Sequence, residues 1–201
     1  MASLLAASTA TADGIFVSVG LPNVSIDGGF DGQATFSGGG SSEIVPKFDA
    51  SNGFTFAGGV IAQDVLMSIS FTQADLDGEW RGLDSPGEYW ALTGELAYLF
   101  RPGSRLQPYL LGGMGVSGVS VKRGSTDGTR FDDAKFGTGL QWRAGGGLLI
   151  GIADRFNIDL QAVKLFGKYD NLDGIADGSL KDFGSDGSIV TISVQYLFGQ
   201  G

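Results

Sequence analysis

Residues 188–198 read SIVTISVQYLF and alternate between two kinds of side chain at every step. One face of this stretch, if it is extended, is wholly apolar: Val190, Ile192, Val194, Tyr196 and Phe198. The opposite face is mostly polar: Thr191, Ser193, Gln195 and Leu197. A period of two residues is typical of a β-strand whose two faces meet different environments. This stretch therefore predicts a strand with one apolar and one polar neighbourhood.

The same alternation recurs along the chain and predicts eight strands, approximately at 14–21, 52–62, 65–73, 88–100, 107–121, 137–152, 156–166 and 188–198. Three connections are short, at 63–64, 101–105 and 153–155, and four are long, at 22–51, 74–87, 122–136 and 167–187. Short and long connections alternate, which places all long loops at one end of the sheet. That arrangement is the pattern of outer-membrane barrels. We therefore predict an all-β fold: an eight-stranded antiparallel up-and-down transmembrane β-barrel with short periplasmic turns and long outer loops.

The composition excludes several classes of protein. The 201 residues include 35 glycines but no cysteine and no histidine, and 22 acidic residues against 13 basic ones give a net charge of −9. Disulfides, zinc sites of the Cys/His kind and His-based catalysis are therefore excluded. The negative charge argues against nucleic-acid binding, which favours a basic surface. We expect no catalytic residues, no cofactor and no metal site, and hence no enzyme.

The alternation alone would also suit a soluble, lipocalin-like binder with its apolar face turned inward. Two observations favour an apolar face turned toward lipid. Aromatic residues collect near both ends of the strands, as in the two girdles of a membrane barrel. The proposed girdle residues are Trp90, Tyr98, Phe100, Trp142, Phe156, Phe166, Tyr196 and Phe198, with Phe54 and Phe71. The polar face also carries charged residues, whose burial in a dry core would cost considerable free energy.

The polar face predicts a network inside the barrel. Its members are Glu95, Gln141, Arg143, Asp159 and Gln161, with Tyr109 and Thr93 beside them. One interpretation is a hydrogen-bonded ionic plug, and the other is a gate in which exchange of ion-pair partners opens a narrow path for small ions. We favour the plug because the interior of an eight-stranded barrel is just wide enough for side chains to fill. Glycines 113, 115, 145, 147 and 151 are expected to relieve crowding in that interior.

The long loops are acidic. Two clusters stand out, Asp75, Asp77, Glu79 and Asp84 in one loop and Asp170, Asp173, Asp177, Asp182 and Asp186 in another. We interpret both as solvated loop surface, although carboxylates at such spacing are also ligands for Ca²⁺ or Mg²⁺. A basic group near the third long loop could meet lipopolysaccharide phosphates: Lys122, Arg123, Arg130 and Lys135. The first residues, MASLLAASTATA, end in an A-x-A pattern, so we expect residues 1–12 to be a truncated signal-peptide remnant and residues 13–201 to form the barrel domain.

Three segments resemble a known family: LQPYLLGGMGV at 106–116, ADRFNIDL at 153–160 and IVTISVQYLF at 189–198. They are similar to the small eight-stranded outer-membrane proteins of the OmpA/OmpX-like superfamily, which includes OmpW-like members and opacity-type surface antigens. The resemblance implies a bacterial outer-membrane protein of the cell envelope and a barrel-assembly machinery that reads a terminal aromatic, here Phe198. We expect a monomer in contact with outer-membrane lipid, with a structural or surface-interaction role carried by its extracellular loops. The alternative is a narrow porin-like channel or an OmpW-like conduit for small hydrophobic molecules.

Overall fold

The computed structural model describes residues 14–28, 34–35, 42–43, 47–80, 83–121, 134–169, 172–173 and 183–198. Its eight long strands are β1 (Gly14–Gly28), β5 (Ser51–Ala62), β6 (Val65–Leu76), β9 (Gly87–Leu99), β10 (Leu106–Val121), β11 (Ala134–Ala153), β12 (Phe156–Tyr169) and β14 (Phe183–Phe198). The short strands are β2 (Ala34–Thr35), β3 (Ser42–Glu43), β4 (Lys47–Phe48), β7 (Gly78–Trp80), β8 (Leu83–Asp84) and β13 (Leu172–Asp173). In these described ranges no helix is long and apolar enough to cross a membrane.

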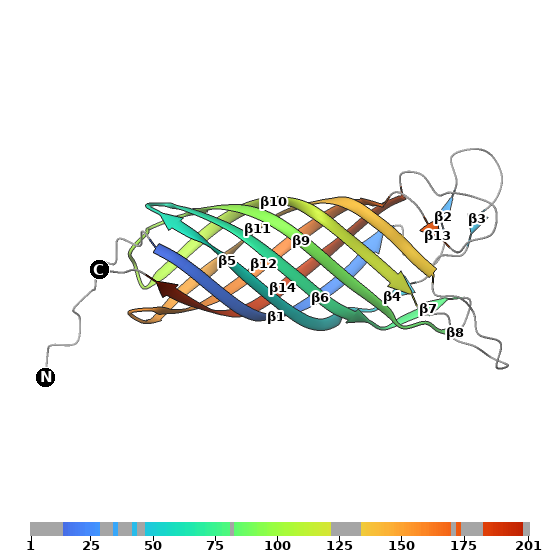
Figure 1. Ribbon diagram of the computed structural model, residues 1–201, viewed down its shortest axis with the longest axis horizontal. Coiled ribbons are helices and arrows are strands. Elements are labelled where there is room, and N and C mark those ends of the chain that lie inside the picture. The colour runs from blue at the N-terminus through green and yellow to red at the C-terminus, as the bar shows by residue number, and fades with distance from the viewer. Residues whose placement is uncertain are drawn as a thin grey trace, which may run out of the picture.

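The eight long strands form one closed antiparallel barrel (Figure 1). Each pairs with the long strands before and after it in the chain, and β1 closes the barrel by pairing with β14 from Ile15 and Phe198 onward. Following the paired residues once around the barrel from Ile15 leads back to β1 at Ser25, ten residues further along. Such a stagger tilts the strands against the barrel axis. The predicted fold, an eight-stranded antiparallel barrel, is confirmed.

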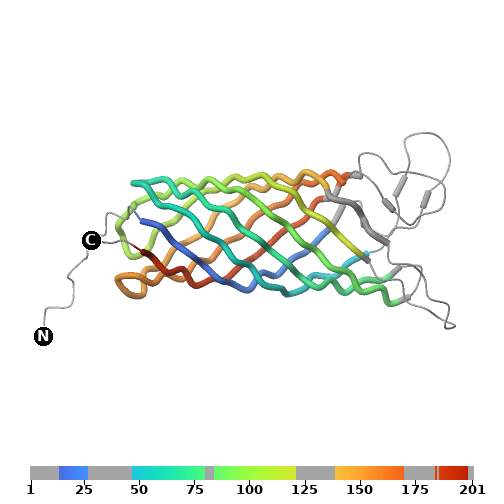
Figure 2. The backbone as a smooth tube through the Cα atoms, viewed as in Figure 1, coloured from blue at the N-terminus to red at the C-terminus, as the bar shows by residue number. Residues whose placement is uncertain are grey.

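The three short connections all lie at one end of the barrel, on the left in Figure 1, where β1 begins and β14 ends. We call this the turn end. Gln63, between β5 and β6, has a φ of 55°, and Arg101 and Gly103, between β9 and β10, have φ values of 64° and 78°. These left-handed residues let the chain reverse within a few residues. The long connections leave from the opposite end, which we call the loop end, as the tube in Figure 2 shows.

Several strands extend further toward the loop end than the sequence predicted. β1 was expected to end at residue 21, before Pro22, but continues to Gly28 because its pairing with β14 is unbroken there. Proline lacks the N–H that a ladder needs, and the pairing of β1 with β5 is interrupted between Gly20 and Asn23. In this part of β1 the apolar face changes side: Asn23 lies exposed whereas Val24 and Ile26 are buried in the interior, so the outward hydrophobic signal is lost although the backbone ladder continues.

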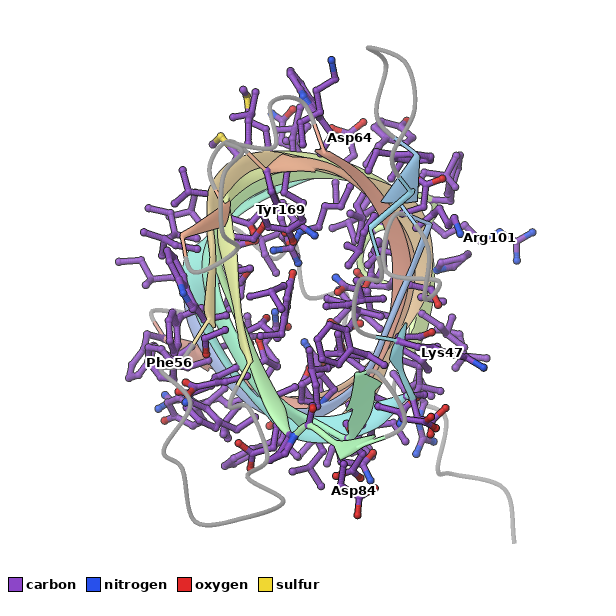
Figure 3. All side chains as sticks on the ribbon, turned by 90° about the vertical axis from the view of Figure 1, so that its right-hand side faces the viewer. Lys47, Phe56, Asp64, Asp84, Arg101 and Tyr169 are labelled. Atoms are coloured by element: carbon purple, nitrogen blue, oxygen red, sulfur yellow. The ribbon has the colours of Figure 1, made fainter. Side chains whose placement is uncertain are left out.

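The apolar face points outward, as expected for a membrane-spanning barrel. Leu21, Ile69 and Leu110 are 73%, 65% and 61% exposed, and similar side chains cover the outer wall of every long strand. Figure 3, viewed from the loop end, shows Phe56 outside the ring of strands and Tyr169 inside it. An apolar surface that surrounds the molecule is far larger than soluble monomers present. A bilayer covers such a band.

Candidate functional site

On β6, β9 and β14 the inner face of the barrel is polar in its middle and apolar toward its ends. On β6 the inward residues run from Leu66 at the turn end through Ser68, Ser70 and Thr72 to Ala74 and Leu76 at the loop end. On β9 they run from Leu99 and Ala97 through Glu95 and Thr93 to Ala91 and Tyr89. On β14 they run from Leu197 through Gln195, Ser193 and Thr191 to Ile189. The strands thus enclose a polar chamber between two apolar layers.

A buried ion pair crosses the centre of the chamber. Arg143 Nη1 lies 2.7 Å from Glu95 Oε1, and the two side chains are only 3% and 8% exposed. Ser68 and Ser70 each donate a hydrogen bond of 3.3 Å to the Glu95 carboxylate, and Arg143 Nη2 donates to Ser70 Oγ at 3.3 Å. Buried charges require such pairing and hydrogen bonding to offset their desolvation. The pair therefore joins β9, β11 and β6 across the lumen.

Gly113 on β10 makes room for this pair. It is the partner of Glu95 on one side and of Arg143 on the other. A Cβ atom at Gly113 would lie 3.1 Å from Glu95 Cγ and 3.2 Å from Arg143 Cγ. Both distances are tighter than ordinary van der Waals contact, so a side chain here would press on both partners. This is the role that the sequence predicted for the inward-facing glycines.

A second polar contact lies one layer nearer the turn end. Tyr109 donates a hydrogen bond of 2.7 Å to Asp159 Oδ1. Its ring fits against Gly147, where a Cβ atom would come within 2.4 Å of the Tyr109 hydroxyl oxygen. Gln161, the next inward residue after Asp159, lines the same small cavity as both groups. That cavity has a volume of about 50 Å³, which is enough for a few water molecules but not for a larger solute.

The remaining predicted members of the network lie away from the ion pair. Gln141 accepts a hydrogen bond of 2.9 Å from Tyr89, nearer the loop end. Thr93 is buried, and its hydroxyl has no hydrogen-bond partner among the described residues. The predicted set therefore divides into three groups: Glu95 with Arg143, Asp159 with Tyr109 and Gln161, and Gln141 with Tyr89.

Apolar layers close the chamber at both ends. The turn-end layer consists of Phe16, Ile61, Leu66, Leu99, Leu149 and Leu197, all buried. The loop-end layer consists of Val24, Ile26, Leu76, Tyr89, Leu165 and Tyr169, also buried. Phe48, in the short strand β4 of the first long connection, is buried too, and a Cβ atom at Gly78 would meet its ring at 2.7 Å. The arrangement places the ion pair in the middle of the barrel, with buried apolar side chains toward both ends.

The predicted aromatic girdles lie on the outer surface. At the turn end the rings of Tyr98 and Phe100 pack edge to face with centroids 5.3 Å apart. The ring of Tyr196 packs in the same manner on Phe156 at 5.0 Å and on Phe198 at 4.7 Å. At the loop end the outward-facing aromatics are Phe54, Phe71, Trp90, Trp142 and Phe166. Such rings suit the two interfaces of a bilayer.

The loop predictions are only partly within the described chain. Asp75, Asp77, Glu79 and Asp84 lie on the hairpin that extends β6 and β9, and no group of three or more acidic residues in the described ranges is placed to hold a metal ion. Asp186 lies exposed on β14. The other acidic residues of that cluster, the basic group at 122–135 and the expected signal remnant at 1–12 lie outside the described residues or have side chains that are not described.

The chain is similar in structure to solved small outer-membrane barrels. Neisserial surface protein A matches with a TM-score of 0.60 and 14% identity, over 93% of this chain and 99% of that one. Ail of Yersinia pestis, in complex with a heparin analogue, matches with a TM-score of 0.55 and 17% identity, over 92% of this chain and 99% of that one. The outer membrane protein OprG of Pseudomonas aeruginosa matches with a TM-score of 0.55 and 15% identity, over 93% of this chain and 97% of that one. This chain has the small outer-membrane barrel fold. Neither a protein-family model nor a curated protein sequence matches the chain.

Sequence reasoning missed the apolar layers that close this barrel. Leu66 and Leu197 were placed on the polar face, where each interrupts an otherwise polar series. Both interruptions fall at the turn end of their strands, and Leu99 and Leu149 fall there too. The signal was therefore present, but it becomes visible only when the eight strands are aligned by height along the barrel.

Proposed function

We propose that the chain is an integral protein of a bacterial outer membrane with a structural and surface-interaction role, and that its lumen does not conduct. The observation that carries this proposal is the pair of buried apolar layers that enclose the Glu95–Arg143 chamber. The barrel wall is closed by continuous strand pairing, and the long connections all leave from the loop end. Loops positioned by a rigid scaffold commonly carry function.

The channel alternative would need a continuous polar path. Ions entering from the turn end would have to pass buried leucines and Phe16, and ions entering from the loop end would have to pass buried aliphatic side chains and two tyrosines whose hydroxyls are bonded to Gln141 and Ser117; this is costly for any ion. A conduit for hydrophobic molecules would instead need an apolar lumen. The cavity here is small and is lined by Glu95, Arg143, Asp159 and serine and threonine hydroxyls. The interior thus favours neither form of transport.

We also propose that no enzymatic activity resides in the barrel. Glu95 and Asp159, the buried carboxylates, are bonded to groups of the barrel interior, and buried apolar residues lie toward both ends of the lumen. The chain has no histidine to act as a general base. A reactant would therefore have to displace a packed layer before it reached any of these groups.

Lipopolysaccharide is the proposed partner in the outer leaflet. Lys164 and Lys168 lie exposed on the outer face of β12, on either side of Phe166 in the loop-end girdle. No hydrogen bond or ion pair joins either ammonium group to another described residue. Unpaired lysines at an aromatic girdle extend toward the headgroup layer, where phosphate groups supply the opposite charge. We further propose that the barrel-assembly machinery recognises Phe198, the aromatic residue that ends β14.

A planar-bilayer recording tests the closed lumen. The protein, refolded in detergent and inserted into the bilayer, is expected to show no discrete conductance steps. A double variant, Leu99→Ser with Leu149→Ser, opens the turn-end layer alone and should also show no steps because the loop-end layer remains; co-flotation with lipid vesicles establishes insertion of both proteins. Regular steps from the wild-type protein, lost when Arg143 is replaced, would contradict the proposal and establish a gated channel.

A further inference from the structure

Three arginines lie at the turn end, and two of them are held in place by the barrel. Arg105 accepts a hydrogen bond of 2.8 Å from the Gly151 N–H through its backbone carbonyl, and its Nε donates to the Gly151 carbonyl at 3.1 Å. Arg155 accepts a hydrogen bond of 2.9 Å from the Leu197 N–H through its backbone carbonyl. Its Nη1 donates to the Tyr196 hydroxyl at 3.4 Å. Each of these two arginines is therefore bonded to a neighbouring strand twice, once through its backbone carbonyl and once through its side chain.

Arg101, on the same rim, differs from these two. It is exposed, its carbonyl accepts a hydrogen bond of 3.2 Å from Ser104 within its own turn, and no bond ties its side chain to another described residue. Figure 3 shows its side chain extended away from the ring of strands. The rim therefore offers two anchored arginines and one free one, which differ in mobility but not in charge.

The anchored pair brackets an apolar surface. Arg105 is bonded to the end of β11, and Arg155 stands in the turn that joins β11 to β12. Between them the outer wall presents Ile152 and Phe156, which are 50% and 43% exposed. The aromatic packing of Phe156 on Tyr196 continues this surface below the rim. An apolar surface under two cationic groups has the polarity of a lipid at the membrane interface, acyl chain below and headgroup above.

The unused donors select the headgroup. A guanidinium has five N–H donors in a rigid planar fork that matches phosphate oxygens. Arg105 and Arg155 each spend one side-chain donor on the barrel and keep the rest. The acidic group beside them in the chain is Asp154, which precedes Arg155.

We propose that Arg105 and Arg155 bind the phosphodiester headgroup of an anionic phospholipid in the leaflet at the turn end. The acyl chains lie along Ile152 and Phe156, and the headgroup is held at the rim by the free N–H donors of the arginines that flank this hairpin. The inference rests on the membrane-spanning barrel but is independent of the closed lumen. It assigns lipid selectivity to a rim opposite the one where lipopolysaccharide is proposed.

Spin-labelled lipids measure this selectivity directly. The full chain is reconstituted in phosphatidylcholine vesicles, and the association of spin-labelled phosphatidylglycerol is compared with that of spin-labelled phosphatidylcholine. The wild-type protein is expected to prefer phosphatidylglycerol over phosphatidylcholine. Each basic group near the lipid surface contributes at most about a fivefold increase in the relative association constant. Arg105→Gln with Arg155→Gln should lower the preference severalfold toward that of a neutral wall.

Two further variants distinguish a built site from general attraction. Arg101→Gln removes the same charge from the free arginine and should change the preference little. Arg105→Lys with Arg155→Lys keeps both charges but not the forks, and should give an intermediate value. The proposal would be overturned if Arg101→Gln and a single Arg105→Gln change lowered the preference for phosphatidylglycerol equally. It would also be overturned if the double lysine variant kept the full wild-type preference.

The source of the phosphate is tested in parallel. The preference is measured in sodium phosphate and in sodium chloride at equal ionic strength. A lipid site keeps the same preference in both salts, whereas a loss in phosphate alone would show a site for the free anion and refute the lipid assignment. A migration shift on unboiled gels confirms for each variant that the barrel itself is intact, so that failure of the site is separable from failure of the fold.

Discussion

Replacing Arg143 should destabilise the barrel far more than loss of a surface ion pair would. Arg143→Met keeps much of the side-chain length but leaves the Glu95 carboxylate, 8% exposed, with only Ser68 and Ser70 as partners. At a separation of about 4 Å between charge centres and an effective dielectric constant of about 20, the lost attraction is about 4 kcal/mol. Breaking a buried pair costs about 3–5 kcal/mol by mutational experience, whereas a surface pair is worth about 0–1 kcal/mol.

The assay is reversible urea unfolding in lipid vesicles, followed by the fluorescence of the outward-facing Trp90 and Trp142. At a slope of about 2 kcal/mol per molar urea, Arg143→Met should lower the midpoint by about 2 M. Glu95→Gln, which leaves the arginine charge unpaired, should also destabilise. The double variant removes both charges and should cost at least about 2 kcal/mol less than the sum of the single changes. Additive effects, or a loss below about 1 kcal/mol in Arg143→Met, would refute the reasoning.

Three further predictions test the interior, the wall and the outer surface. Gly147→Ala places a methyl group against the Tyr109 hydroxyl, so it should disturb the Tyr109–Asp159 bond and cost about 1–3 kcal/mol in the same unfolding assay; an unchanged midpoint would mean that this region is loosely packed. Leu96→Arg sets a charge on the outer wall in the middle of the apolar band and should cost about 2–4 kcal/mol, against about 0–1 for Asn23→Arg at the loop-end border, and equal costs would contradict the lipid-facing orientation. Lys164→Gln with Lys168→Gln should weaken lipopolysaccharide association with nanodisc-embedded barrel severalfold and reduce its salt dependence, measured by native mass spectrometry; Lys47→Gln, which removes one loop-end charge away from β12, is the control, and an equal loss there would count against the β12 site.

The eight strands and their faces could be predicted from the sequence because each strand meets lipid on one side and a polar lumen on the other. Because of this contrast, apolar and polar side chains alternate along stretches such as 190–198. The ends of the strands could not be predicted in the same way. Toward the loop end the apolar residues of β1, Val24 and Ile26, face the interior, so Asp27 and Asp186 pair where no outward hydrophobic face marks the strand.

The members of the lumen network could also be named from the sequence, but their pairing could not. Glu95 and Arg143 lie on β9 and β11, which are not neighbours, and meet only because both pair with Gly113 on the intervening strand β10. A shift of one residue in either register would separate them and turn one outward. The anchored arginines are a further case, because Arg155 and Tyr196 come together only when β12 pairs with β14.

The most direct test of the membrane-spanning barrel is the electrophoretic mobility of the refolded chain with and without boiling. A closed barrel held by eight continuous ladders is expected to stay compact in SDS at room temperature. The unboiled sample should therefore migrate faster than the boiled one, and it should require detergent or lipid to remain in solution. A chain that shows a single band under both conditions, and that stays folded and soluble in plain buffer, would contradict the outward apolar face on which the whole account depends.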